Sequence, residues 1–170
     1  MNKLHVSIVG GSGYTGSELL RLLVNHPYIE IDQITSRQDD GKNVTEIFPF
    51  LPKKVTNKFI HPDNASFDQS ELIFFATPNG IAMNFAEKLI SKGKKIIDLA
   101  ADFRIKNIQL WEKWYGMKHA CPKLVEMAVY GLSEINKNEI KNAKIIANPG
   151  WYPTAIKLAL YPVINKKIIK

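Results

Sequence analysis

The chain has 170 residues, 45% of them hydrophobic, and a formal net charge of +7. This hydrophobic content excludes a disordered or fibrous chain, and the length suffices for one globular domain with a full core. The charge raises the question of nucleic acid. However, the basic residues are scattered and form no stripe that alternates with exposed aromatic residues, so we expect solvated lysines and no nucleic-acid partner.

The cysteine content and the length of the apolar runs indicate the cellular compartment in which the protein is expected. The single cysteine, Cys121, excludes an internal disulfide and fits a reducing environment. No apolar run approaches the ~18 residues of a membrane-spanning helix. The first apolar stretch is interrupted by Gly10-Gly11 too early for the core of a signal peptide. We therefore expect a cytoplasmic protein with no membrane partner.

The first predicted strand, Leu4 to Val9, runs into a glycine-rich turn. Gly11, Gly13 and Gly16 have the G-x-G-x-x-G spacing, and a helix pattern follows up to Pro27. In this spacing, Gly11 is expected to make the tight turn, Gly13 to leave room for a pyrophosphate, and Gly16 to let the helix pack closely. A plain strand–helix turn is the weaker alternative. The predicted cofactor-binding residues of this loop are Gly10, Gly11, Ser12, Gly13, Tyr14, Thr15 and Gly16.

The second predicted strand, Ile29 to Thr35, ends where a Rossmann-type sheet meets the adenosine ribose. Its tip carries Ser36 and Arg37, which can bind a 2′-phosphate, whereas an acidic residue there would indicate NAD. Asp32 lies three residues too early, inside the strand. We therefore predict NADP as the cofactor. An ordinary solvated arginine is the alternative for Arg37.

Strands and helices then alternate along the chain, which predicts an α/β fold with a doubly wound, mostly parallel, Rossmann-like sheet. The domain is expected to span 1–170. The further expected strands are Lys54 to Ile60, Leu72 to Ala76, Lys95 to Leu99, a short strand near Ala128, and Ala143 to Ala147. The further expected helices are Ile81 to Ser91, Ile108 to Tyr115, a brief one from Asn136, and Thr154 to Ile164.

Loops at the carboxyl ends of such strands line the ligand crevice. Thr77, Pro78 and Asn79 follow one central strand and are expected to contact the cofactor. Arg104 follows the next strand and is a candidate anion binder, although a structural pair with Asp102 is about equally favoured.

Neither a metal site nor a base-stacking platform is predicted. Asp98 and Asp102 lack nearby His or Cys, and His119 and Cys121 have no second pair of ligands. The aromatic helix with Trp111, Trp114 and Tyr115 is expected to belong to the core or to a subunit interface.

The last strand ends in a sharp glycine turn followed by a helix. A helix N-terminus after such a turn can lower the pKa of a thiol and activate it as a nucleophile. Position 151 is where this nucleophile would stand, but it holds Trp151, which cannot act as one.

These stretches jointly resemble one family, N-acetyl-gamma-glutamyl-phosphate reductase of arginine biosynthesis. The resemblance covers nearly the whole chain, in the family's order. A related reductase of lysine biosynthesis, acting on a carrier-linked 2-aminoadipyl phosphate, is the rival. The matching stretches are Gly10 to Gly16, Ile34 to Arg37, Ala76 to Gly80, Asp98 to Arg104, Trp111 to Gly116 and Asn148 to Thr154.

The resemblance implies a reductive dephosphorylation of N-acetylglutamyl phosphate to N-acetylglutamate semialdehyde. In the family a cysteine thiolate attacks the acyl phosphate, NADPH then reduces the thioester, and a histidine of a second domain assists. The resemblance also implies that Arg104, Asn148 and Gly150 contact the small-molecule acyl-phosphate substrate.

The chain departs from this pattern in three ways. The family's cysteine falls on Trp151, the family usually has Pro where Ser133 stands, and the family's second, α+β domain with its homo-oligomer interface is not seen. We therefore expect a truncated chain that is inactive alone. A non-catalytic NADP-binding or assembly module and a decayed gene product are the alternatives.

Overall fold

The computed structural model describes residues 3–168, so the four terminal residues of the predicted domain 1–170 lie outside the described part. Strands and helices alternate as expected. The strands are β1 Leu4–Val9, β2 Ile29–Thr35, β3 Phe59–Ile60, β4 Leu72–Phe75, β5 Lys95–Asp98, β6 Val129–Tyr130 and β7 Ile145–Ala147. The helices are α1 Tyr14–Leu23, α2 Val44–Ile47, η1 Pro62–Asn64, α3 Ala82–Ser91, α4 Ile108–Tyr115, α5 Pro122–Met127, α6 Ser133–Asn142 and α7 Trp151–Asn165.

The seven strands form one sheet in the order β3-β2-β1-β4-β5-β7-β6. All the pairs between these strands are parallel, which confirms the predicted doubly wound α/β class. The chain starts in the middle of the sheet, winds outward through β2 and β3, and then returns to add β4 beside β1. The strand order therefore reverses between β1 and β4, and ligands bind at such a switch point.

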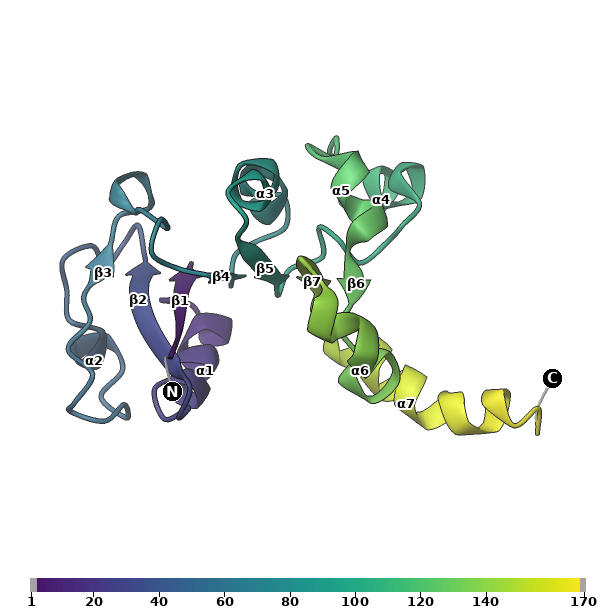
Figure 1. Ribbon diagram of the computed structural model, residues 1–170, viewed down its shortest axis with the longest axis horizontal. Helices are drawn as coiled ribbons and strands as arrows, with labels where there is room; N and C mark the ends of the chain where they lie inside the picture. Colours follow the sequence, from purple (N-terminus) through teal and green to yellow (C-terminus); the bar gives the residue numbers. More distant parts are fainter. Residues whose placement is uncertain (1–2, 169–170) are drawn as a thin grey trace.

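Helices cover both faces of the sheet. Figure 1 shows α3, α4 and α5 on one face and α1, α6 and α7 on the other. Alternate residues of β4 supply the two cores: Ile73 and Phe75 pack with α3 and Trp111, and Phe74 packs with Leu20 of α1. Because successive side chains point to opposite faces and both faces of β4 contact a core, the strand reads as an unbroken apolar run.

Some boundaries differ from the sequence predictions. The strand expected from Lys54 is confined to Phe59–Ile60, and α2 and α5 were not predicted. Pro122 stands at the first position of α5, a recognised start signal for a helix. The helix expected from Asn136 begins three residues earlier, at Ser133. Ser133 is the first residue of this helix, a position that favours Pro.

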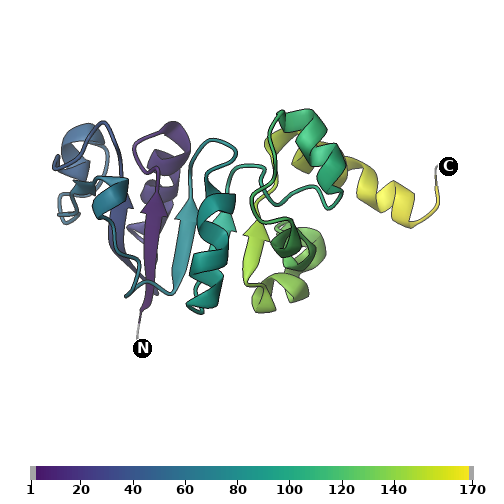
Figure 2. The ribbon, with the colours of Figure 1, turned by 90° about the horizontal axis from the view of Figure 1, so that it is seen from above.

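The final helix is exposed along most of its length. Helix α7 begins at Trp151, three residues before the expected start at Thr154, because Gly150 already takes the N-cap position. None of its residues is buried. Figures 1 and 2 show it extending away from the sheet beyond α6.

Candidate functional site

The turn between β1 and α1 depends first on Gly10. Its φ of +79° lies in the left-handed region that favours glycine, and an added Cβ would lie 2.6 Å from the carbonyl oxygen of Ala76. The sequence predicts that Gly11 permits the tight turn, and the left-handed conformation within this turn belongs to the preceding residue, Gly10. Gly10 supplies it, because β1 must bend sharply while staying beside the loop that follows β4.

Gly11 and Gly16 are required for close packing. A Cβ on Gly11 would collide with the side chain of Ile34 on β2, and one on Gly16 would collide with the backbone of Gly11. The predicted close approach of helix and strand at Gly16 is thus confirmed. By contrast, no atom lies within 4 Å of a Cβ placed on Gly13. Gly13 is also the N-cap of α1 and makes no side-chain cap, so free N–H groups of the helix face this open space.

The glycine loop and the tip of β2 meet, as the sequence predicts. The backbone N–H of Gly11 donates to the carbonyl oxygen of Thr35 at 2.9 Å. Ser12 Oγ lies 2.8 Å from the Oγ of Ser36, which is 3% exposed. The adjacent Arg37 is exposed. A buried hydroxyl and an exposed guanidinium therefore stand beside the loop that would hold a pyrophosphate.

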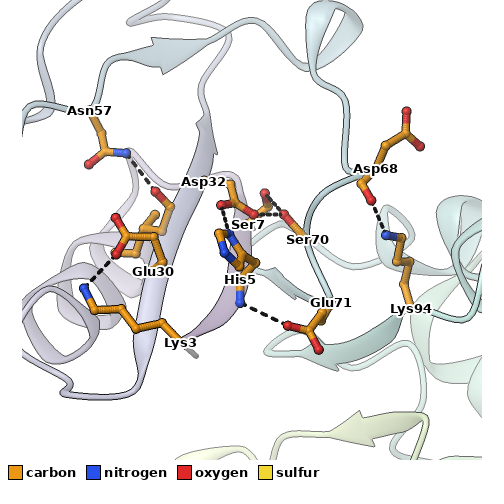
Figure 3. A network of polar contacts seen from close by, with 11 residues as sticks. Lys3, His5, Ser7, Glu30, Asp32, Asn57, Asp68, Ser70, Glu71 and Lys94 are labelled. Atoms are coloured by element: carbon orange, nitrogen blue, oxygen red, sulfur yellow. Dashed lines mark hydrogen bonds and ion pairs between the residues drawn. The ribbon is translucent and has the colours of Figure 1, made fainter. Parts of the chain in front are cut away.

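Asp32 lies away from this tip, in a separate polar network that Figure 3 shows. Its carboxylate lies 2.6 Å from His5 Nδ1 and accepts the hydroxyl of Ser70 at 2.6 Å, and Ser70 also contacts Ser7 at 2.7 Å. The register between β1 and β2 passes from Ile31 to Gln33 and leaves Asp32 as a bulge. The hydrogen bond and the charge of Asp32 raise the pKa of His5 above its ordinary value.

Thr77 gives an observation that favours a ligand. Among residues 3–168, Thr77 Oγ1 is the one buried side-chain nitrogen or oxygen atom that has no hydrogen-bond partner. Thr77 and Pro78 line a hollow of about 290 Å³ together with Gly13, Tyr14 and Thr15. A buried polar atom without a partner is costly, and a bound polar group relieves that cost. The residues present therefore fit a dinucleotide here.

Two buried carboxylates, those of Asp98 and Asp102, organise the loop after β5. Asp98 accepts the backbone N–H groups of Ala100 at 3.0 Å and Asp102 at 3.1 Å. Burial, together with the neighbouring Asp102 carboxylate, raises the pKa of Asp98 to about 7. Asp102 in turn accepts from the backbone of Gly80 at 2.8 Å and of Met83 at 3.0 Å, at the start of α3. A helix-capping pattern in the sequence could not reveal this role of Asp102, because Gly80 and Met83 lie about 20 residues before it in the chain.

Arg104 joins the ends of two strands. Its Nε donates to the carbonyl oxygen of Asn148 at 2.7 Å, and its Nη2 donates to that of Leu99 at 2.7 Å. The alternative of a structural pair with Asp102 is therefore wrong, since that carboxylate is engaged at α3. A Cβ on Gly150 would lie 3.0 Å from Nη1, so this third nitrogen stands beside the turn that leads into α7.

Trp151 is the first residue of α7 and is 83% exposed. It shares an open hollow of about 730 Å³ with the first turns of α1, the loops after β4 and β5, and the turn before α7. The hollow thus connects the predicted cofactor loop with position 151. Its lining includes Tyr14, Thr15, Asn79, Arg104, Gly150 and Trp151.

The loop with His119 and Cys121 is structural. His119 Nε2 lies 2.8 Å from the carbonyl oxygen of Asp102, and its Nδ1 accepts the backbone N–H of Cys121 at 3.2 Å. Trp111 is fully buried and donates to Ala101 at 2.8 Å, whereas Trp114 is 73% exposed. No group of three or more His, Cys, Asp or Glu side chains suited to a metal occurs within residues 3–168.

Comparison with known proteins agrees with this geometry. The chain belongs to the semialdehyde dehydrogenase NAD-binding domain family, whose model matches residues 5–143. It is 55% identical over 162 residues to an N-acetyl-gamma-glutamyl-phosphate reductase of Nitrosospira multiformis, and 51% identical over 168 residues to one of Neisseria meningitidis. These alignments cover 95% and 99% of this chain but 47% and 48% of the relatives. The chain thus spans about half the length of the curated relatives it matches.

Solved structures share the fold at low sequence identity. An aspartate semialdehyde dehydrogenase II of Vibrio cholerae, complexed with ASA, has a TM-score of 0.69 at 19% identity, over 96% of this chain and 47% of that one. An aspartate semialdehyde dehydrogenase of Candida albicans with NADP has a TM-score of 0.67 at 14% identity, over 97% of this chain and 48% of that one. In the part of the chain that the structure describes, no helix combines the length and apolar character needed to cross a membrane.

Proposed function

We propose that this chain is the NADP-binding part of an N-acetyl-gamma-glutamyl-phosphate reductase, with N-acetylglutamyl phosphate and its semialdehyde as the reactant pair. The observation that carries the proposal is the hollow that links Tyr14 and Thr15, at the start of α1, to Arg104, Gly150 and position 151. Curated relatives at 51–55% identity over at least 95% of the chain support it.

In this proposal the residues present bind and orient the two ligands. Free N–H groups at the start of α1 and the open space at Gly13 suit a pyrophosphate. Thr77 Oγ1 takes a partner from the cofactor. The Nη1 of Arg104, beside Gly150, is placed for an anionic group of the substrate. NADPH supplies hydride when bound. The N-terminus of α7 marks where the relatives' nucleophile is expected.

The choice of NADP rests on Ser36 and Arg37 and is tested by cofactor binding. A charge-assisted hydrogen bond is worth about 1.5–3 kcal/mol. We expect Arg37→Ala to weaken NADPH binding about ten-fold or more with little change for NADH, measured by fluorescence or calorimetric titration. Arg21→Ala, which removes an exposed guanidinium on α1, is the matched control. Equal losses for both cofactors with Arg37→Ala would contradict the 2′-phosphate assignment.

One observation favours a second function, a non-catalytic NADP-binding or assembly module. Trp151, the first residue of α7, stands where the resemblance implies a nucleophile, and indole has no lone pair suited to attack a carbonyl carbon. Tight NADPH binding without turnover would support this function. The cytoplasm remains the expected location.

A further inference from the structure

The turn after β2 carries two adjacent carboxylates that take different partners. Asp39 Oδ2 lies 3.4 Å from Ser36 Oγ, and the backbone N–H of Asp39 donates to the same Oγ at 3.1 Å. Asp40 instead accepts the backbone N–H of His61, at the end of β3, at 2.7 Å. Of the two, Asp39 therefore faces the residue at the β2 tip where the adenosine ribose is expected.

The hydroxyl of Ser36 is already shared among several groups. Its oxygen accepts the Asp39 N–H and lies 2.8 Å from Ser12 Oγ. A hydroxyl has one hydrogen, so Ser36 can donate to Ser12, to the Asp39 carboxylate or to a bound phosphate, but only to one of them at a time. A carboxylate at this place competes with a 2′-phosphate for the hydrogen and also repels its charge.

Lys42 neutralises this carboxylate. Its Nζ lies 2.9 Å from Asp39 Oδ1, with the side chains of Lys42 and Asp39 51% and 16% exposed. The turn itself holds the pair together, because the backbone N–H of Lys42 donates to the carbonyl oxygen of Asp39 at 3.1 Å. Gly41, with a φ of +79°, donates to the carbonyl oxygen of Phe59 at 2.8 Å and fixes the turn against β3.

We propose that Lys42, by neutralising the Asp39 carboxylate in this ion pair, preserves the preference for NADP(H) over NAD(H) that Ser36 and Arg37 create. With Lys42 in place, the tip of β2 carries no net negative charge and accepts a 2′-phosphate at Ser36 and Arg37. Without it, the bare Asp39 carboxylate repels the phosphate and accepts a ribose 2′-hydroxyl, which is the part an acidic residue plays in NAD sites. This inference rests on the proposed function, since it needs the cofactor at this tip.

The test is a double-mutant cycle on cofactor affinity. Dissociation constants for NADPH and NADH are measured by calorimetry for the unaltered chain, Lys42→Gln, Asp39→Asn and the double variant. We expect Lys42→Gln to lower the ratio of NADPH to NADH affinity about five-fold and Asp39→Asn to raise it by a similar factor. The double variant should return within about two-fold of the unaltered chain, and the single effects should shrink in 0.5 M salt.

The turn offers matched controls. Asp40→Asn removes the neighbouring carboxylate, Lys53→Gln removes an exposed lysine of the next loop, and Lys42→Arg keeps the positive charge. All three should leave the affinity ratio within about two-fold of the unaltered chain. Thermal melts identify the folded variants, and if Lys42→Gln does not fold, Asp39→Asn carries the test.

The outcomes separate the two proposals. If the unaltered chain prefers NADPH but Lys42→Gln and Asp39→Asn behave like the controls, the ion pair has no role in specificity and the inference is overturned. If the unaltered chain binds neither cofactor, the proposed function itself fails. If it prefers NADH, the assignment of a 2′-phosphate site at the β2 tip is overturned together with the inference.

Discussion

At the scale of single residues, His5 is a histidine whose pKa the fold raises. Its ring lies 2.6 Å from the Asp32 carboxylate, and Glu71 and Glu30 add smaller favourable charges. These contacts raise the pKa of His5 above the ordinary 6.5. Folding therefore favours the protonated ring. The resulting stabilisation is complete below the ordinary pKa and is lost as the pH rises through the raised value.

We accordingly expect His5→Gln to lower the melting temperature more near pH 5.5 than near pH 8.5, where less of the His5 ring is protonated. The measurement is a series of thermal melts of the unaltered and variant chains across this range. His26→Gln, which changes an exposed histidine of the α1–β2 connection, is the control and should show no such trend. A loss with His5→Gln that is equal at both pH values would show that the Asp32 contact does not depend on charge.

At the scale of elements, α7 has an apolar composition and no core to pack against. Ile156 and Ile164 are 58% and 56% exposed, and Leu158 and Leu160 are also exposed. Exposed apolar patches of this kind drive association. We expect the 170-residue chain to form oligomers or aggregates in light scattering, and Ile156→Glu combined with Ile164→Glu to reduce them.

The matched control for α7 is Met127→Glu, which adds the same charge at an exposed apolar residue of α5. It should leave the association unchanged, because its exposed neighbours on α5 include the charged Lys123 and Glu126. A monodisperse unaltered chain with a cooperative melt would contradict this prediction, because it would show that the exposed apolar residues of α7 do not drive association.

At the scale of the whole molecule, the fold builds a crevice but places an indole where a thiol is expected. We expect the unaltered chain to show no phosphate-dependent reduction of NADP with N-acetylglutamate semialdehyde, because Trp151 cannot form a thioester. Measurable turnover by this chain would refute that argument.

The same site predicts how an introduced thiol behaves. Trp151→Cys places a thiol at the exposed first turn of α7, where free N–H groups lower its pKa, so it should be alkylated rapidly near neutral pH. Cys121 is the internal control: burial raises its pKa to about 12, with smaller effects from Glu87 and Asp102, so the unaltered chain should react slowly. A slow reaction of Trp151→Cys would mean that the helix start does not activate this position.

The sequence by itself determined the features that depend on local spacing and periodicity. Apolar runs alternating with helix patterns predicted the parallel sheet, and the glycine spacing placed the dinucleotide loop between β1 and α1. The same reading placed Ser36 at the tip of β2 and Asp32 inside the strand. These features follow from residues close together in the chain, so a pattern of a few residues is enough to predict them.

Only the tertiary structure decided which partner each polar side chain takes. Arg104 contacts a carbonyl 44 residues away, and not its neighbour Asp102. Gly10 makes the turn because the loop after β4 lies beside it, and Asp39 faces Ser36 while Asp40 faces His61. Such choices depend on how strands distant in sequence come together. Hydrogen bonding and charge then select among several partners that the sequence alone leaves equally available.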